Sequence, residues 1–192
     1  MDWFQISKTV IQYLWLTLGF VWLVAAFSVK RTSRTRSSGW RLLEIALAVV
    51  AFIVGFSRRF YFNSFNRTFL PDTPVVAISG LAITFIGIAF AIWARLMLGG
   101  NWSGSVTLKE NHTLVRRGPY AIVRHPIYSG FLLALIGTVI VFRQLRGLVA
   151  LVVAFLTLLL KSRLEEQLMT EQFGAEYAEY SQRVKALIPF IY

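Results

Sequence analysis

The residues of this sequence best suited to chemistry lie in two short polar segments between apolar runs. The first is Arg124-His125-Pro126-Ile127-Tyr128-Ser129-Gly130, and the second is the carboxylate pair Glu165-Glu166. Together they offer a cation, an imidazole, a phenol and two carboxylates, which are groups that orient polar ligands or move protons. The chain has no Cys, so a thiolate nucleophile and a thiolate metal site are both excluded.

Proline at position 126 predicts how the first segment is presented. The residue before a proline is kept out of helical geometry, and proline itself suits the first turn of a helix. We therefore expect His125 to be extended at the start of a helix. Tyr128 and Gly130 would follow within the next turn, the first supplying a hydroxyl and the second a place where a ligand could approach the backbone.

The neighbours of this segment can be inferred from turn and helix geometry. Gly118-Pro119 predicts a turn that brings Tyr120 close to His125. Glu165 and Glu166 directly follow the last apolar run, and successive helical residues point about 100° apart. We therefore expect one carboxylate to face the site directly, with pairing of both to nearby basic side chains in solvent as the alternative.

Composition indicates that these segments are carried by a membrane protein. The 192 residues are 56% hydrophobic, with a mean hydropathy of +0.61. The net charge of +11 comes from 20 Lys and Arg against 9 Asp and Glu, and these basic residues lie between apolar runs and form no single polar face. That pattern favours an anionic membrane surface over nucleic acid as the partner.

The predicted fold is all-α, a polytopic integral membrane protein with about five transmembrane helices. The last two runs are short and predict a tight helical hairpin, and the residues after Lys161 predict a separate amphipathic helix on the cytoplasmic side. With the N-terminus outside, most of the 20 Lys and Arg residues fall on the cytoplasmic side, together with both polar segments. The apolar runs are Thr9–Val29, Leu42–Phe56, Val75–Leu98, Ile127–Phe142 and Leu148–Leu160.

The residues alone do not specify a reaction. His112 and His125 are separated by a long loop with no acidic ligand at a metal-like spacing, which predicts no metal site. The sequence also has no phosphate-binding glycine loop and no nucleophile elbow. These observations predict a small membrane protein with a polar pocket on its cytoplasmic face, and a non-enzymatic scaffold remains an alternative.

The last half of the chain carries a series of short motifs in a fixed order, namely His112-x-Leu114-Val115-x-x-Gly118-Pro119-Tyr120, Arg124-His125-Pro126-x-Tyr128-x-Gly130, Glu165-Glu166, Phe173-Gly174-x-Glu176-Tyr177-x-x-Tyr180 and Ile188-Pro189-Phe190. In this combination the sequence resembles the isoprenylcysteine carboxyl methyltransferase family. Asn101-Trp102-Ser103 also resembles the prokaryotic members. The resemblance implies a methyltransferase that binds S-adenosylmethionine and takes a lipid or prenylated substrate sideways from a bacterial or archaeal membrane.

The resemblance also implies roles for particular residues and an order of regions. Residues 1–98 would form a three-helix membrane region and 99–192 the catalytic region, in one integrated domain. Arg124 or Arg163 would orient an acidic acceptor, and Glu166 would complete the catalytic group. Phospholipid N-methyltransferases share part of the pattern, and sterol-type NADPH reductases share an Arg-His-Pro segment, so both remain alternatives. The expected cofactor-binding residues are Leu114, Tyr120, His125, Tyr128, Glu165 and Glu166.

Overall fold

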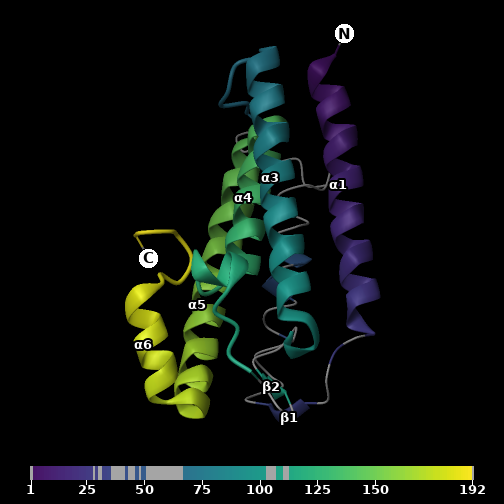
Figure 1. The fold of residues 1–192 in the computed structure, drawn as a ribbon. Helices are drawn as coiled ribbons and strands as arrows, with labels where there is room; N and C mark the ends of the chain where they lie inside the picture. The colour runs from purple at the N-terminus through teal and green to yellow at the C-terminus, as the bar shows by residue number, and fades with distance from the viewer. Residues whose placement is uncertain are drawn as a thin grey trace.

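Four long helices of the part of the chain that can be described form an elongated bundle in the computed structural model (Figure 1). The structure describes residues 2–27, 29, 32–35, 42, 46–47, 49–50, 67–102, 107–109 and 113–191. The bundle helices are α1 (Trp3–Ala26), α3 (Pro74–Leu98), α4 (Pro126–Phe142) and α5 (Leu145–Phe173). A shorter helix, α6 (Ala175–Arg183), lies against the polar end of α5, and the C-terminal segment then turns back toward α4.

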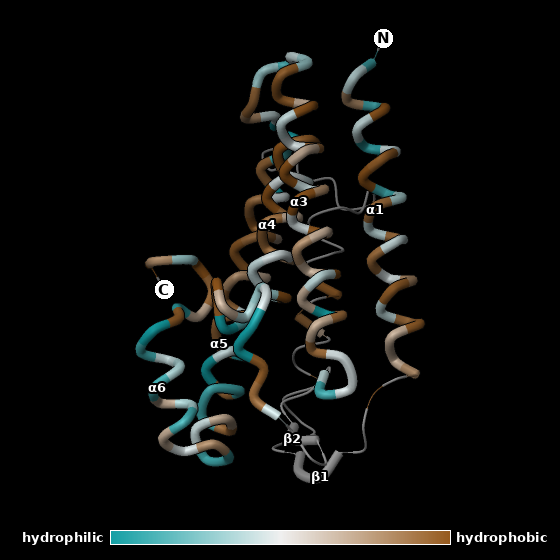
Figure 2. Tube along the Cα trace, in the orientation of Figure 1, coloured by the Kyte–Doolittle hydropathy of each residue, from teal (hydrophilic) through white to brown (hydrophobic). Residues whose placement is uncertain are grey.

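The prediction of a helical membrane protein is confirmed. Among the described residues, α1, α3 with its extension to Asn101, and α5 are long and apolar enough to cross a membrane, and α4 is a shorter apolar helix. Figure 2 shows apolar residues along the bundle and polar residues on α6 and the adjoining end of α5. The predicted run Leu42–Phe56 lies largely outside the described residues, so a total of five crossings stays a prediction.

Small residues bring α3 and α4 into direct backbone contact. A Cβ added at Gly87 would overlap the backbone nitrogen of Ala134, and one at Gly130 would lie 2.7 Å from the nitrogen of Ala91. Such close approach is typical of membrane helices that associate through glycine and alanine. Gly130 was expected to leave its backbone open to a ligand, and this expectation is wrong, because α3 occupies that space.

The polar tail differs from the predicted separate helix. Helix α5 continues without interruption from the apolar run through Lys161 to Phe173 and ends at Gly174, whose φ is +51°. No glycine or proline interrupts residues 148–173, so the change from apolar to polar side chains alters the surroundings of the helix and leaves its backbone regular. The carboxylate pair therefore projects from the same rigid helix as the apolar run.

Two smaller contacts close the ends of the bundle. Strands β1 (Thr32–Thr35) and β2 (Thr107–Lys109) pair antiparallel at the polar end, a feature absent from the prediction. At the opposite end, the segment before α3 bonds the two-residue turn between α4 and α5, where Phe69 N donates to Arg143 O at 3.0 Å. The α4–α5 hairpin is therefore held at its tip by this backbone bond, and its other end carries the two polar segments.

Candidate functional site

The His-Pro segment begins a helix, as predicted, but the backbone of His125 is not extended, because its ψ lies between the helical and the extended regions. His125 is the N-cap residue of α4 with φ −119° and ψ 62°, and Pro126 lies in the first turn. The 3-10 turn η2 (Gly118–Ala121) follows the Gly-Pro sequence as predicted, and Tyr120 in that turn lines the same pocket as His125. The backbone N–H of His125 donates to Ala186 O at 2.9 Å, so the C-terminal segment binds the chain just before the helix begins.

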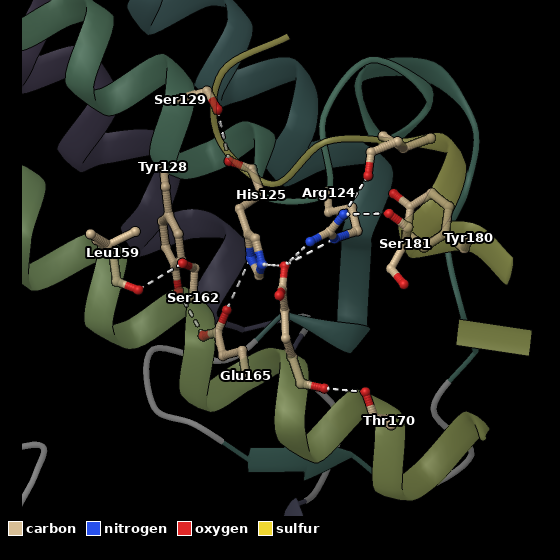
Figure 3. Close-up of polar contacts among 12 residues, drawn as sticks. Arg124, His125, Tyr128, Ser129, Leu159, Ser162, Glu165, Thr170, Tyr180 and Ser181 are labelled. Carbon is tan, nitrogen blue, oxygen red and sulfur yellow. Dashed lines mark hydrogen bonds and ion pairs between the residues drawn. The ribbon is translucent and has the colours of Figure 1, made fainter. Parts of the chain in front are cut away.

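A network of ionisable side chains joins α4 to α5 (Figure 3). His125 contacts both carboxylates, through Nδ1 to Glu165 Oε2 at 3.4 Å and through Nε2 to Glu166 Oε1 at 3.2 Å. Tyr128 Oη donates to Glu165 Oε1 at 2.6 Å, and its ring stacks on His125 with centroids 5.5 Å apart. Each partner therefore restricts the rotation of the next, which presets the site before any ligand arrives.

Arg124 fixes the second carboxylate of the pair. Its Nε and Nη2 donate to Glu166 Oε1 at 2.9 and 2.5 Å, while Nη1 donates to the carbonyl oxygens of Ser181 and Val184. Arg124 thus links α5 to the end of α6, and its charge is balanced by a partly buried carboxylate. Charge-assisted bonds of this kind are the strongest that protein side chains make.

The network controls the protonation of its imidazole. Burial by itself lowers the pKa of His125, but the hydrogen bonds and negative charges of Glu165 and Glu166 outweigh it, so the pKa is raised from its ordinary value. On α6, burial raises the pKa of Tyr180 to about 12. Tyr180 Oη donates to Tyr120 O at 2.5 Å, so this phenol stays protonated and acts as a hydrogen-bond donor at neutral pH.

The network borders a pocket whose wall is largely apolar. Of the residues predicted to bind a cofactor or substrate, Glu166 and Arg163 are not among the lining residues. The angle between successive helical residues explains this, because Glu165 faces the pocket while Glu166 faces Arg124. Arg163 is exposed on α5. The predicted residues that line the pocket are Leu114, Tyr120, Arg124, His125, Tyr128 and Glu165.

Several lining residues were missed in the predicted set. Asn101 and Trp102 follow α3 and form one wall, and Met169 extends the wall one turn beyond Glu165. Buried Arg95 supports Trp102, because its guanidinium lies 4.6 Å from the Trp102 ring and donates to Ala25 O and Gly99 O. The Asn-Trp pair carried a usable signal in its resemblance to prokaryotic methyltransferases, whereas His112 lies outside the described residues.

Comparisons with known proteins point to one family. A model described as the isoprenylcysteine carboxyl methyltransferase (ICMT) family matches residues 80–171. Protein-S-isoprenylcysteine O-methyltransferase B of Arabidopsis thaliana is 32% identical over 115 residues, covering 58% of this chain and 58% of that protein. A solved structure of the eukaryotic intramembrane Ras methyltransferase ICMT has a TM-score of 0.57 at 25% identity, covering 78% of this chain and 53% of that chain.

A relative with a different name matches more of the chain. Cobalt-zinc-cadmium resistance protein CzcN of Cupriavidus metallidurans is 26% identical over 159 residues, covering 82% of this chain and 65% of that protein. By contrast, the chain spans little more than half the length of the Arabidopsis relative and of the solved structure. The family-model match extends from α3 to the polar part of α5, so it includes the His-Pro segment and both carboxylates.

Proposed function

We propose that this chain is a member of the isoprenylcysteine carboxyl methyltransferase family and that it is an integral-membrane methyltransferase that uses S-adenosylmethionine. The observation that carries the proposal is the Arg124–Glu166–His125–Glu165–Tyr128 network beside an apolar-walled pocket. Use of S-adenosylmethionine is general in this family of methyltransferases. Bound there, the cofactor would supply a methyl group on a sulfonium sulfur, which is an electrophile that needs alignment with the acceptor more than it needs a strong base.

The chemistry of the pocket suits that cofactor. Glu165 supplies an anionic acceptor for ribose hydroxyls or an amino group, and its bond to Tyr128 fixes which oxygen is presented. The Tyr120 and Tyr128 rings, with Met169, offer surfaces against which a purine can pack. Leu114 lines the pocket from a segment without regular secondary structure, and its backbone groups would be the ones that meet the adenine edges. His125 would hold the cofactor's carboxylate end as a cation, consistent with its raised pKa.

The acceptor is proposed to be the carboxylate of a lipid-modified or small amphiphilic molecule. A carboxylate is already ionised at neutral pH, so the protein needs a cation to orient it and no base to activate it. Arg124 is the better-placed cation, because it lines the pocket and Glu166 holds its guanidinium in one orientation. Arg163 stays an alternative from the exposed side of α5, from which it could meet a headgroup or a substrate at the membrane surface.

The membrane face of the site and the division of the chain into regions are proposed from the distribution of basic residues and from the order of the segments. The basic residues favour a cytoplasmic catalytic face. The resemblance of Asn101-Trp102-Ser103 to prokaryotic members favours a bacterial or archaeal membrane. Residues 1–98 would serve as the membrane region and 99–192 as the catalytic region, with the substrate entering from the bilayer. Among the described residues, no group of three or more His, Cys, Asp or Glu could hold a metal ion, so the name of the CzcN relative does not lead us to propose metal binding.

Transfer of a tritiated methyl group tests the activity. The protein in lipid nanodiscs is incubated with methyl-labelled S-adenosylmethionine and either N-acetyl-S-farnesylcysteine or phosphatidylethanolamine. We expect label in the farnesylated acid that base releases as methanol, since esters hydrolyse and N-methyl groups do not. Tyr128→Phe should lower the rate, while Glu179→Gln on the exposed face of α6 serves as the control. Base-stable label in the phospholipid alone would favour the N-methyltransferase alternative and contradict the proposal.

A further inference from the structure

The C-terminal segment ends in a tight turn with an unusual residue in it. Ile191 N donates to Ile188 O at 3.2 Å, which places Pro189 and Phe190 in the middle of the turn. Phe190 has a φ of +65°. A positive φ at the third position of a turn is ordinarily supplied by Gly or Asn, and for a bulky side chain it is a genuine outlier. A strained residue of this kind calls for a compensating interaction.

The same turn carries the most exposed apolar side chains of its region. Phe190 is 94% exposed and Ile191 is 75% exposed, and Ile188 is 41% exposed. Surrounded by water, both the strain at Phe190 and the exposure of these side chains would be unfavourable. We call Ile188–Ile191 the apolar turn. Both costs are offset together if its side chains lie in a medium less polar than water.

The position of the apolar turn identifies that medium. The residues just before it are buried, Ala186 at 5% and Leu187 at 2%, and Ser129 in the first turn of α4 donates to Leu187 O at 2.5 Å. The apolar turn therefore leaves the protein where the apolar helix α4 begins, and Figure 1 shows the C-terminal segment beside that end of α4. In a chain whose helices cross a membrane, this level corresponds to the boundary between hydrocarbon and headgroups.

Charges next to the apolar turn suit the same boundary. Arg183 and Lys185 are exposed immediately upstream, and Arg183 shares an exposed ion pair with Glu179 at 2.8 Å. Basic side chains beside exposed apolar ones are typical of segments that bind the surface of an anionic bilayer. A contact with a second protein would offset the apolar exposure as well, but it would give no particular reason for these cations.

We propose that the apolar turn inserts Phe190 and Ile191 into the interfacial layer of the bilayer, with Arg183 and Lys185 facing anionic headgroups. The insertion bears on the candidate site, because the backbone before the turn also accepts hydrogen bonds from the His-Pro segment. Lys185 O accepts from Arg124 N at 2.8 Å, and Ala186 O accepts from His125 N at 2.9 Å. Bilayer contact thus holds the C-terminal segment to which the His-Pro segment is hydrogen-bonded.

Spin labelling at single cysteines tests the insertion without any assay of methyl transfer. The natural chain has no Cys, so each introduced thiol is labelled alone. Ile191→Cys keeps Phe190 in place, and Phe190→Cys reports on the turn itself. Phe85→Cys, on the exposed apolar face of α3, is the control for the membrane interior, and Gln182→Cys, on the exposed side of α6, is the control for water. The labelled proteins are placed in nanodiscs of phosphatidylcholine with a minority of phosphatidylglycerol.

Collision with oxygen, which concentrates in lipid, is compared with collision with a polar nickel chelate, which stays in water. We expect the oxygen-to-nickel ratio at positions 190 and 191 to exceed that at position 182 several-fold and to fall below that at position 85. A ratio equal to that at position 182 would overturn the proposal. Low collision with both reagents would also overturn it, since it would mean that protein, such as a second copy, covers the apolar turn.

Discussion

Replacing Glu166 by Gln isolates the contribution of charge to the network. The substitution keeps the shape of the side chain and an acceptor oxygen, but the two bonds from Arg124, at 2.9 and 2.5 Å, lose their ionic partner. A bond to a charged group contributes about 1.5–3 kcal/mol against about 0.5–1.5 kcal/mol for a neutral one, so two weakened bonds cost about 2 kcal/mol. The side chain of Glu166 is 26% exposed, and solvent screening reduces this to about 1–2 kcal/mol.

Thermal unfolding in detergent measures that loss. For a chain of this size 1 kcal/mol corresponds to about 2–4 °C in Tm, so Glu166→Gln should lower Tm by about 2–8 °C. Glu179→Gln is the matched control, because its exposed ion pair with Arg183 contributes about 0–1 kcal/mol. Glu166→Gln should also lower the pKa of His125, read by NMR of labelled histidine in a His112→Gln background. Equal Tm values for the two variants, together with an unchanged pKa of His125, would refute this role of the Glu166 charge.

Contacts in the fold support three further predictions. Gly87→Val should destabilise the protein by at least about 1–3 kcal/mol because its Cβ would meet the backbone of α4. Gly19→Ala, with open space around it, is the control and should leave stability unchanged. Equal Tm values for the two variants would contradict the close packing of α3 on α4. The pKa of His125 is raised on folding, so protonated His125 stabilises the folded protein fully below about pH 6.5, and this stabilisation is lost as pH rises through the folded pKa. His125→Gln should therefore flatten the decline of Tm above about pH 6.5. Parallel Tm curves for the two proteins would count against this. Tyr128→Phe keeps the stacked ring and removes the hydrogen bond to Glu165. It should weaken binding of S-adenosylhomocysteine by about tenfold, which corresponds to a loss of about 1.4 kcal/mol in binding free energy. Unchanged affinity would mean that this bond does not preset the site.

Local rules predicted the parts of the site that depend on neighbouring residues. The non-helical backbone of His125 is explained by the proline after it, and the helical angle between adjacent residues explains why only one carboxylate of the pair lines the pocket, without specifying that it is Glu165. The turn at Gly118-Pro119 likewise placed Tyr120 correctly. Each of these features is determined within a few residues of the chain, where backbone geometry leaves few choices.

Contacts between distant segments could not be predicted in the same way. The close approach of Gly87 and Gly130 depends on how α3 and α4 cross, and a glycine spacing alone does not state its partner. The end of α5 was missed for a different reason, since the change of hydropathy at Lys161 resembles a boundary between two helices. Arg124 and Arg163 were indistinguishable as basic residues near the site, and only the fold places Arg124 at the pocket.

Calorimetric titration of the purified protein with S-adenosylhomocysteine, and separately with NADPH, tests most directly whether this pocket belongs to a methyltransferase. We expect saturable binding of S-adenosylhomocysteine to the natural chain, loss of that binding in His125→Ala and its retention in Glu179→Gln. We expect no binding of NADPH. Binding of NADPH in place of S-adenosylhomocysteine, or equal affinity of the natural chain and His125→Ala for S-adenosylhomocysteine, would contradict the assignment of the pocket.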